Sequence, residues 1–276
     1  MGIPYAEVIG DPVEHSKSPV IHKFWLERLG IEGDYRATRV AVDELPDFLA
    51  GRREDPDWRG CNVTAPLKAE AALQVVDPTG VSGRIGAANT VFRSPLGECI
   101  AANTDLQGLS VALGAAKALG NQVCVIGAGG AARATLEFLR LRGAVEVSLI
   151  ARDINRGKSI HRLSGSSGAV YPFERAAEAI ANTEWLINAT PLGMTGMPSM
   201  PESILKALGS DYDAFVFDMV YSPLETDLLR RARQLGRQTA DGLVMLIGQA
   251  AAAFELFFGM PAPREHDAEL RERLTS

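Results

Sequence analysis

A glycine-rich turn carries the strongest chemical signal in the chain. Gly127, Gly129 and Ala132 form a G-x-G-x-x-A pattern directly after the apolar run Val123 to Ile126. In this context the first glycine allows a tight turn, the second lets the backbone approach a pyrophosphate, and the small third residue lets a helix pack on the strand. Free N–H groups at the start of that helix would bind the anion. The pattern predicts a dinucleotide site, with a merely tight turn as the alternative.

Charged residues follow the next predicted strand, where such sites select their cofactor. The strand from Val145 to Ile150 leads into Ala151, with Arg152 and Arg156 close behind. A carboxylate at the strand tip is usual for NAD, whereas arginine binds the 2′-phosphate of NADP. The arginines favour NADP, although Asp153 is an unfavourable neighbour for a phosphate. The alternative is a solvated charged loop that holds no ligand.

Polar clusters in the first part of the chain exceed what folding requires. They are His15 to Pro19, Asn62 to Lys68, Asn89-Thr90 and Asn103 to Asp105, and Gln249 interrupts an apolar helix later on. Ser18 can cap a helix that begins with Pro19, which leaves Ser16 without a structural role. Asn89-Thr90 and Asn103 to Asp105 are each expected near the end of a short strand. Amides and carboxylates at strand ends tend to point into ligand crevices, and a buried glutamine must be hydrogen-bonded. These clusters predict a site for a polyhydroxylated small molecule.

The elements that must position these residues alternate between strands and helices. Apolar runs at 123–126, 145–150, 185–187 and 214–220 are separated by helical stretches, which is typical of a parallel sheet. We therefore predict an α/β fold with two domains. Residues 106–240 form a Rossmann-type doubly wound dinucleotide-binding domain, and residues 1–105 form a smaller α/β domain. A long helix over Leu243 to Phe258 begins the remaining segment, 241–276.

Composition and charge exclude several classes of protein. The 276 residues include 28 Lys and Arg against 34 Asp and Glu, a net charge of −6, with 46% apolar residues. This mixture is that of a globular chain and lacks the basic excess that nucleic acid or an acidic membrane surface would need. Three cysteines without a C-x-x-C pair give no disulfide framework or zinc spacing. With no signal-like segment and no apolar run of about 20 residues, we expect a cytoplasmic protein without a metal site.

A series of motifs, in order along nearly the whole chain, resembles the shikimate dehydrogenase family. The motifs are Gly10 to Pro12 with His15 to Pro19, Asn62 to Lys68, Ala88 to Thr90, Asn103 to Asp105, Gly127 to Ala131, Asn188 to Met194, Asp218 to Pro223, and Asp241 to Gln249.

The resemblance implies reversible NADPH-dependent reduction of 3-dehydroshikimate to shikimate, a step of aromatic amino-acid and chorismate biosynthesis. It makes 1–105 the substrate-binding catalytic domain, 106–240 the NADP-binding domain, and 241–276 helices that pack back on the substrate domain. Lys68 and Asp105 would be the catalytic pair. The implied substrate-binding residues are Ser16, Ser18, Thr64, Asn89, Asp105, Tyr221 and Gln249. The implied cofactor-binding residues are Gly127, Ala128, Gly129, Gly130, Ala131, Arg152, Arg156, Thr190, Met219 and Gly242.

The chemistry of hydride transfer suits the implied catalytic pair. Hydride addition to a carbonyl develops negative charge on oxygen, so a cation with a transferable proton should lie beside it and a carboxylate should hold that cation. Lys68 would donate the proton, and Asp105 would hold the lysine side chain in place. Ala151 and Asp153 depart from the family pattern, which leaves open a paralogue that acts on quinate or uses NAD. A catalytically silent regulator is a remote alternative, and a monomer or a homodimer fits equally.

Overall fold

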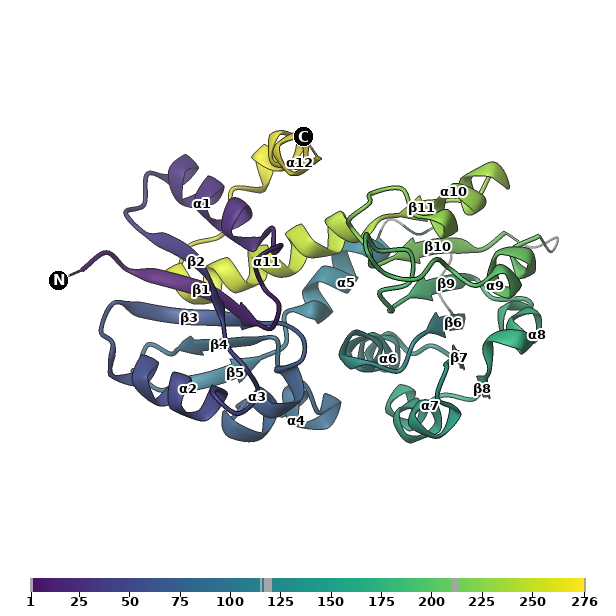
Figure 1. Cartoon of the computed structure of the whole chain (residues 1–276), viewed down its shortest axis with the longest axis horizontal. Helices are drawn as coiled ribbons and strands as arrows, with labels where there is room; N and C mark the ends of the chain where they lie inside the picture. The colour runs from purple at the N-terminus through teal and green to yellow at the C-terminus, as the bar shows by residue number, and fades with distance from the viewer. Residues whose placement is uncertain (1, 115, 117–120, 210–212, 276) are drawn as a thin grey trace. The chain divides into compact units, whose positions relative to one another are not determined.

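The computed structural model describes residues 2–114, 116, 121–209 and 213–275, and the chain divides into two compact units. Met1–Asp105 with Gln249–Ser276 forms the first unit, and Leu106–Gly248 forms the second. The later boundary falls inside helix α11 (Gly242–Phe258) rather than at the predicted position before Asp241. The reason is packing, because Met245 belongs to the core of the second unit. Figure 1 labels the elements.

The first unit is built on a mixed sheet. Its described strands run in the order β2-β1-β3-β4-β5, with β1 parallel to β2 and β3, and β4 antiparallel to β3 and β5. The strands are β1 (Tyr5–Gly10), β2 (Asp34–Arg39), β3 (Trp58–Val63), β4 (Thr90–Arg93) and β5 (Cys99–Ala102). The helices are α1 (Ser18–Leu29), α2 (Leu45–Glu54), α3 (Lys68–Gln74), α4 (Val81–Ile85) and α12 (Asp267–Thr275), with a 3-10 turn at Arg264–His266.

One edge of this sheet gathers the polar segments. Thr64 follows β3 and Asn103 follows β5, whereas Asn89 precedes β4. The expectation that Asn89-Thr90 ends a strand was wrong, because β4 runs antiparallel to its neighbours. Its beginning therefore lies beside the end of β3, where Asn62 is the partner of Thr90 in the strand register. The antiparallel strand thus brings Asn89 to the same edge as Thr64 and Asn103.

The second unit is a doubly wound parallel sheet, as predicted. The described strands run in the order β11-β10-β9-β6-β7-β8, and every pair is parallel. The strands are β6 (Gln122–Ile126), β7 (Glu146–Ile150), β8 (Val170–Tyr171), β9 (Trp185–Asn188), β10 (Phe215–Asp218) and β11 (Thr239–Ala240). The helices are α5 (Asp105–Gly114), α6 (Gly130–Arg142), α7 (Ile154–His161), α8 (Ala176–Ile180), α9 (Glu202–Ala207) and α10 (Asp227–Gln234), with 3-10 turns at Arg162–Ser164 and Phe173–Arg175.

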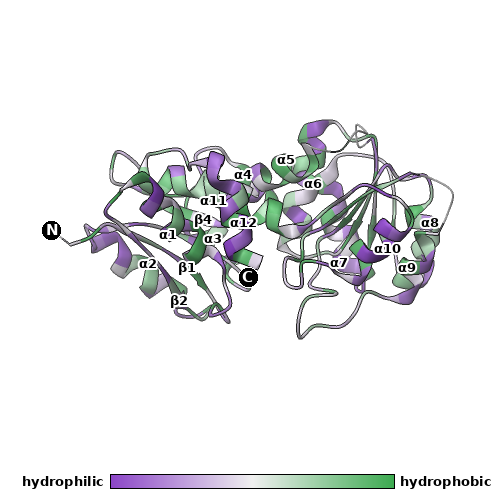
Figure 2. Cartoon of the chain, turned by 90° about the horizontal axis from the view of Figure 1, so that it is seen from above, coloured by the Kyte–Doolittle hydropathy of each residue, from purple (hydrophilic) through white to green (hydrophobic). Residues whose placement is uncertain are grey.

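Both faces of the parallel sheet are covered by apolar side chains. Successive strand residues point to opposite faces, so Val123 and Val125 enter one core cluster while Cys124 and Ile126 enter the other. The strands are therefore continuous apolar runs, as expected for a sheet buried on both sides. In Figure 2 these strands are green and hydrophilic purple gathers on the surrounding helices. None of the described helices is long and apolar enough to cross a membrane.

His22 lies in an aromatic cluster of the first unit with no exposure to solvent. Its ring stacks on Tyr35 with centroids 3.9 Å apart, and Trp25 and Phe254 lie beside it. Within the described residues neither ring nitrogen has a hydrogen-bond partner. Burial lowers the pKa of His22 to about 3, because a charged imidazolium has no solvation in this site.

His22 should therefore make the protein sensitive to acid. The unfolded chain binds a proton on this histidine below about pH 6.5 and the folded chain does not, so stability is lost as the pH falls from 6.5 towards 3. Replacing His22→Phe should remove roughly 2–3 kcal/mol of the stability difference between pH 7 and pH 4.5. Denaturant unfolding of both proteins across this range measures it. If the unfolding free energies of the wild type and the variant changed equally with pH, His22 would not be the group responsible for the loss of stability.

Candidate active site

Lys68 and Asp105 form an ion pair at the polar edge of the first sheet. The Lys68 Nζ lies 2.6 Å from Asp105 Oδ2, and the two side chains are 23% and 8% exposed. Lys68 is the first residue of α3 and Asp105 is the first residue of α5. A carboxylate is favoured at a helix start by the free N–H groups there. The Lys68 side chain keeps some exposure to solvent, whereas the Asp105 side chain is buried.

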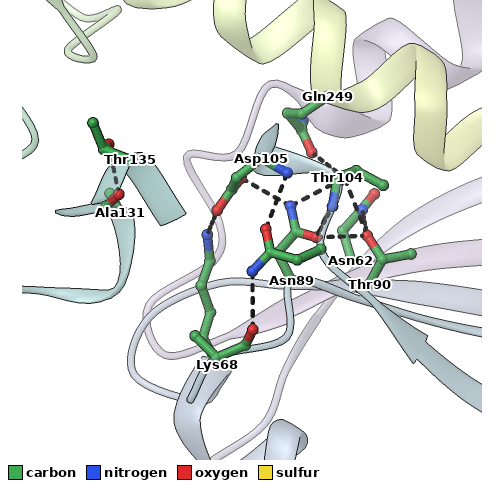
Figure 3. A network of polar contacts seen from close by, with 11 residues as sticks. Asn62, Lys68, Asn89, Thr90, Thr104, Asp105, Ala131, Thr135 and Gln249 are labelled. Atoms are coloured by element: carbon green, nitrogen blue, oxygen red, sulfur yellow. Dashed lines mark hydrogen bonds and ion pairs between the residues drawn. The ribbon is translucent and has the colours of Figure 1, made fainter. Parts of the chain in front are cut away.

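The Lys68 ammonium group and the Asn89 amide hold the Asp105 carboxylate in place (Figure 3). Asn89 Nδ2 donates to Asp105 Oδ1 at 2.8 Å, so both carboxylate oxygens are occupied. The Asn89 side chain is itself fixed, because its Oδ1 accepts from the Thr104 backbone N–H at 2.7 Å. Asn103 Oδ1 accepts from the Asp105 N–H at 3.2 Å. Asp105 thus acts as a fixed acceptor that orients the lysine.

The hydrogen-bond network continues from this edge into the core of the first unit. Thr90 Oγ1 donates to Asn89 Oδ1 at 3.0 Å and accepts from Asn62 Nδ2 at 3.1 Å. The Tyr35 hydroxyl donates to Asn62 Oδ1 at 2.6 Å. Burial raises the pKa of Tyr35 well above its usual value, so the phenol stays a donor. Asn62 lies in a motif but received no role in the sequence analysis, and nothing in the sequence marked Tyr35.

The hydroxyl pair at the start of α1 differs from the predicted arrangement. Ser18 does not cap the helix, whose N-cap is Lys17, and Ser16 Oγ accepts from the Ser18 backbone N–H at 3.3 Å. Ser16 therefore has the local structural role expected of Ser18. The Ser18 side chain is buried and lies near the Tyr35 phenol, whose pKa it lowers against the larger effect of burial. This contact joins Ser18 to the network that reaches Asp105.

Thr64 and Gln249 also belong to the first unit. Thr64 follows β3, and its N–H donates to the Ile9 carbonyl at 2.9 Å, which fixes the chain beside the end of β1. Gln249 comes from α11, far away in sequence. Its Oε1 accepts from Thr104 Oγ1 at 3.4 Å. The structure therefore brings Gln249, Asn89, Asp105 and Lys68 together, while Ser18 joins them through Tyr35 and Asn62.

The glycine turn of the second unit has the geometry that anion binding needs. Gly127 has φ +122°, and a Cβ there would lie 2.8 Å from Thr190 Cγ2. Gly129 is the N-cap of α6, and a Cβ on it would enter open space. The first glycine is thus required by the fold, whereas the second keeps room free above the helix start. The first-turn N–H groups of α6 are placed to bind a phosphate.

A pocket of about 410 Å³ lies over this turn. Several residues predicted to bind the cofactor line this pocket, namely Gly127, Ala128, Gly129, Arg152, Arg156 and Thr190. Asp153 lines it as well. Sequence reasoning missed the apolar part of the wall, formed by Phe173, Pro191, Leu192, Met197 and Pro198. These residues come from loops after β8 and β9; Pro191 and Leu192 lie in the motif Asn188 to Met194, whereas Phe173, Met197 and Pro198 lie outside every motif. The wall and the glycine turn together fit an adenine nucleotide.

The other predicted residues of the second unit follow the ends of β9, β10 and β11. Thr190 Oγ1 donates to Asn188 Oδ1 at 2.6 Å, and Asn188 Nδ2 donates to Asp218 Oδ1 at 2.8 Å. Burial raises the pKa of Asp218 to about 6, against the effect of the hydrogen bonds it accepts. Gly242 packs against the Met219 carbonyl so closely that a Cβ would overlap it. Tyr221 follows in the same loop, where burial raises its pKa.

Comparison with known proteins agrees with this geometry. Residues 8–91 match the family model described as the shikimate dehydrogenase substrate binding domain, 111–198 match shikimate / quinate 5-dehydrogenase, and 242–269 match the shikimate 5'-dehydrogenase C-terminal domain. The shikimate dehydrogenase (NADP(+)) of Sphingopyxis alaskensis is 46% identical over 99% of this chain and 97% of its own length. The chain belongs to the shikimate dehydrogenase family.

Solved structures of the shikimate dehydrogenase family share the whole fold. The shikimate 5-dehydrogenase of Thermus thermophilus, in complex with NADP(H) and shikimate, has a TM-score of 0.84 and 34% identity, covering 99% of this chain and 100% of that chain. The shikimate 5-dehydrogenase of Listeria monocytogenes, in complex with shikimate and NAD, has a TM-score of 0.86 and 27% identity, covering 99% and 96%. The family and the two-domain α/β fold predicted from the motifs are thus confirmed.

The two glycines of the turn give a matched pair of substitutions. Gly129→Ala should leave the melting temperature unchanged and weaken NADP⁺ binding about tenfold or more, because its Cβ fills space needed by the pyrophosphate. Gly127→Ala should lower the melting temperature as well, since its positive φ and its contact with Thr190 oppose a side chain. Thermal denaturation and calorimetric titration separate the two effects. Unchanged NADP⁺ affinity in Gly129→Ala would contradict the assignment of this turn.

Proposed function

We propose that this protein catalyses the reversible NADPH-dependent reduction of 3-dehydroshikimate to shikimate in aromatic amino-acid biosynthesis. The observation that carries the proposal is the ion pair of Lys68 and Asp105, 2.6 Å apart and fixed by Asn89 at an edge lined with hydroxyl and amide groups. The relatives named above are shikimate dehydrogenases, and the two solved structures are complexes of shikimate with NADP(H) or NAD. In this proposal Ser16, Ser18, Thr64, Asn89 and Gln249 of the first unit, with Tyr221 of the second, bind the hydroxyls and carboxylate of the substrate.

The cofactor, when bound, supplies the hydride that reduces the substrate carbonyl. As negative charge develops on the carbonyl oxygen, the Lys68 ammonium stabilises it and donates a proton to it. Asp105 accepts from the lysine and so keeps Nζ directed at one position. Asn89 prevents the carboxylate from rotating, because it binds the other oxygen. In the reverse direction neutral Lys68 takes up the proton of the shikimate hydroxyl.

The resident cofactor fits the residues of the second unit. The glycine turn offers N–H groups for the pyrophosphate, and the exposed Arg152 and Arg156 side chains can hold a 2′-phosphate at the pocket wall. Thr190, Met219 and Gly242, at the strand ends of the same unit, would bind the remainder of the cofactor. The chain itself carries net charge −6, so binding of these anionic ligands depends on such local donors.

Replacing Lys68 tests the catalytic role. Lys68→Ala should lower kcat about 10³-fold and change KM for shikimate far less, because the proton is transferred only as the reaction proceeds. Lys68→Arg is the matched control, since it keeps a cation beside Asp105 but a guanidinium does not give up its proton. This variant should retain shikimate binding and still lose most turnover. Equal losses in kcat and affinity, or none, would exclude the role.

Steady-state kinetics with two substrates and two cofactors tests the function itself. We expect shikimate to be oxidised with higher kcat/KM than quinate, and NADP⁺ to exceed NAD⁺ by about tenfold or more because of its charge-assisted phosphate contacts. A higher kcat/KM with quinate would assign the chain to the quinate-specific alternative. Cofactor binding without any NADPH oxidation would indicate the silent regulator.

A further inference from the structure

Asp153 occupies the turn between β7 and α7 and caps the helix. It is the N-cap residue of α7, with extended backbone, and its Oδ1 accepts from the Arg156 backbone N–H at 3.0 Å. A side-chain acceptor at this position satisfies one of the free N–H groups of the first turn. Asp153 is also one of the residues that line the pocket beside the glycine turn. Asp153 thus has a structural contact and also brings a negative charge to the cofactor site.

Arg152 and Arg156 lie on either side of Asp153 and make no ion pair with the described residues. In the part of the chain that the structure describes, no carboxylate lies within ion-pair distance of Arg152 or Arg156, and both side chains are exposed. Three other arginines of the unit, Arg140, Arg175 and Arg230, each pair with an acid three residues away. The Asp153 carboxylate accepts a hydrogen bond from the helix backbone and forms no ion pair with Arg152 or Arg156. Both arginines therefore stay available to a ligand.

A further arginine adds positive charge near the same place. Partial burial and the nearby charge of Arg156 both lower the pKa of Arg133, which lies in the first turns of α6. The pocket wall thus combines a cationic field with one carboxylate. A 2′-phosphate dianion would gain from the arginines and lose from Asp153, whereas a ribose 2′-hydroxyl would feel little repulsion and can donate to a carboxylate.

We propose that Asp153 is a specificity-determining residue, which holds Arg152 and Arg156 open for the 2′-phosphate by capping α7 and narrows the preference for NADP over NAD by its charge. The proposal rests on the proposed function, because it takes the pocket as the adenosine end of a dinucleotide site. It separates the two effects of one side chain. The cap depends on an acceptor oxygen, and the discrimination depends on the negative charge.

Asp153→Asn tests the charge alone, because asparagine caps helices as well as aspartate does. The probes are adenosine 2′,5′-bisphosphate and adenosine 5′-monophosphate, which differ only in the 2′-phosphate, titrated into the full-length protein by calorimetry. The variant should bind the bisphosphate about tenfold tighter and the monophosphate equally or more weakly, with an unchanged melting temperature. The gain should shrink at high salt, since exposed charges are screened.

Two controls distinguish the cap and the net charge. Asp153→Ala should lower the melting temperature because the cap is lost. Asp227→Asn removes one negative charge at the start of α10, where Asp227 pairs with Arg230, and should leave both nucleotide affinities unchanged.

The proposal would be overturned if the ratio of the two probe affinities in Asp153→Asn stayed within about twofold of the wild-type ratio, instead of changing about tenfold. Asp153 would then be a helix cap only. If the wild type and the variant each bound the two probes with equal affinity, both the proposal for Asp153 and the assignment of NADP would be wrong. The proposed function would still be judged separately, by shikimate oxidation with NAD⁺. The kcat/KM ratio of NADP⁺ to NAD⁺ should rise in Asp153→Asn in parallel with the binding ratio.

Discussion

The ion pair of Lys68 and Asp105 is the contact on which the first unit's polar edge depends. A carboxylate that is largely removed from solvent is costly unless its oxygens are bonded and a cation lies close. Here Lys68 takes one oxygen and Asn89 the other. Asn89 is itself hydrogen-bonded by Thr104 and Thr90. The hydrogen bonds continue from Thr90 to Asn62 and from Asn62 to Tyr35. The pair is therefore positioned by the core of the unit rather than by its own flexible side chains.

The two units place anion recognition in different kinds of groups. The first unit offers the Lys68 ammonium group, paired with Asp105, among hydroxyl and amide groups, which suits a small polyhydroxylated acid. The second offers backbone N–H groups at the start of α6 and guanidinium groups at the start of α7. Backbone donors are fixed by the fold and need no net positive charge. An acidic chain can bind anions in this way, because the local donors and not the total charge determine the potential in a pocket.

Two residues that stabilise helix starts lie next to residues proposed to bind ligands. Ser16 bonds the Ser18 N–H at the start of α1, and Asp153 bonds the Arg156 N–H at the start of α7. In each case a side chain that stabilises a helix end stands next to groups proposed to bind ligand. Sequence reasoning gave the capping role to Ser18, because it assumed that the residue before the proline is the N-cap. The helix in fact includes Ser18, whose buried hydroxyl turns to Tyr35.

The sequence by itself determined the features that depend on near neighbours. Apolar runs gave the strands of the parallel sheet, the glycine spacing gave the turn after β6, and the motif order gave the family. The predicted catalytic pair, Lys68 and Asp105, came from these motifs. Its role stays a prediction, although the structure shows the two side chains in contact.

Only the tertiary structure decided which distant residues meet. The antiparallel course of β4 brings Asn89 to Asp105, and α11 brings Gln249 to Thr104 across 145 positions of sequence. Tyr35 and Asn62 join the network through contacts of the same long range. The apolar pocket wall around Phe173 and Met197 is likewise assembled from separate loops. Strand direction and helix packing set these meetings, and both are outcomes of burying the whole core, which no local pattern specifies.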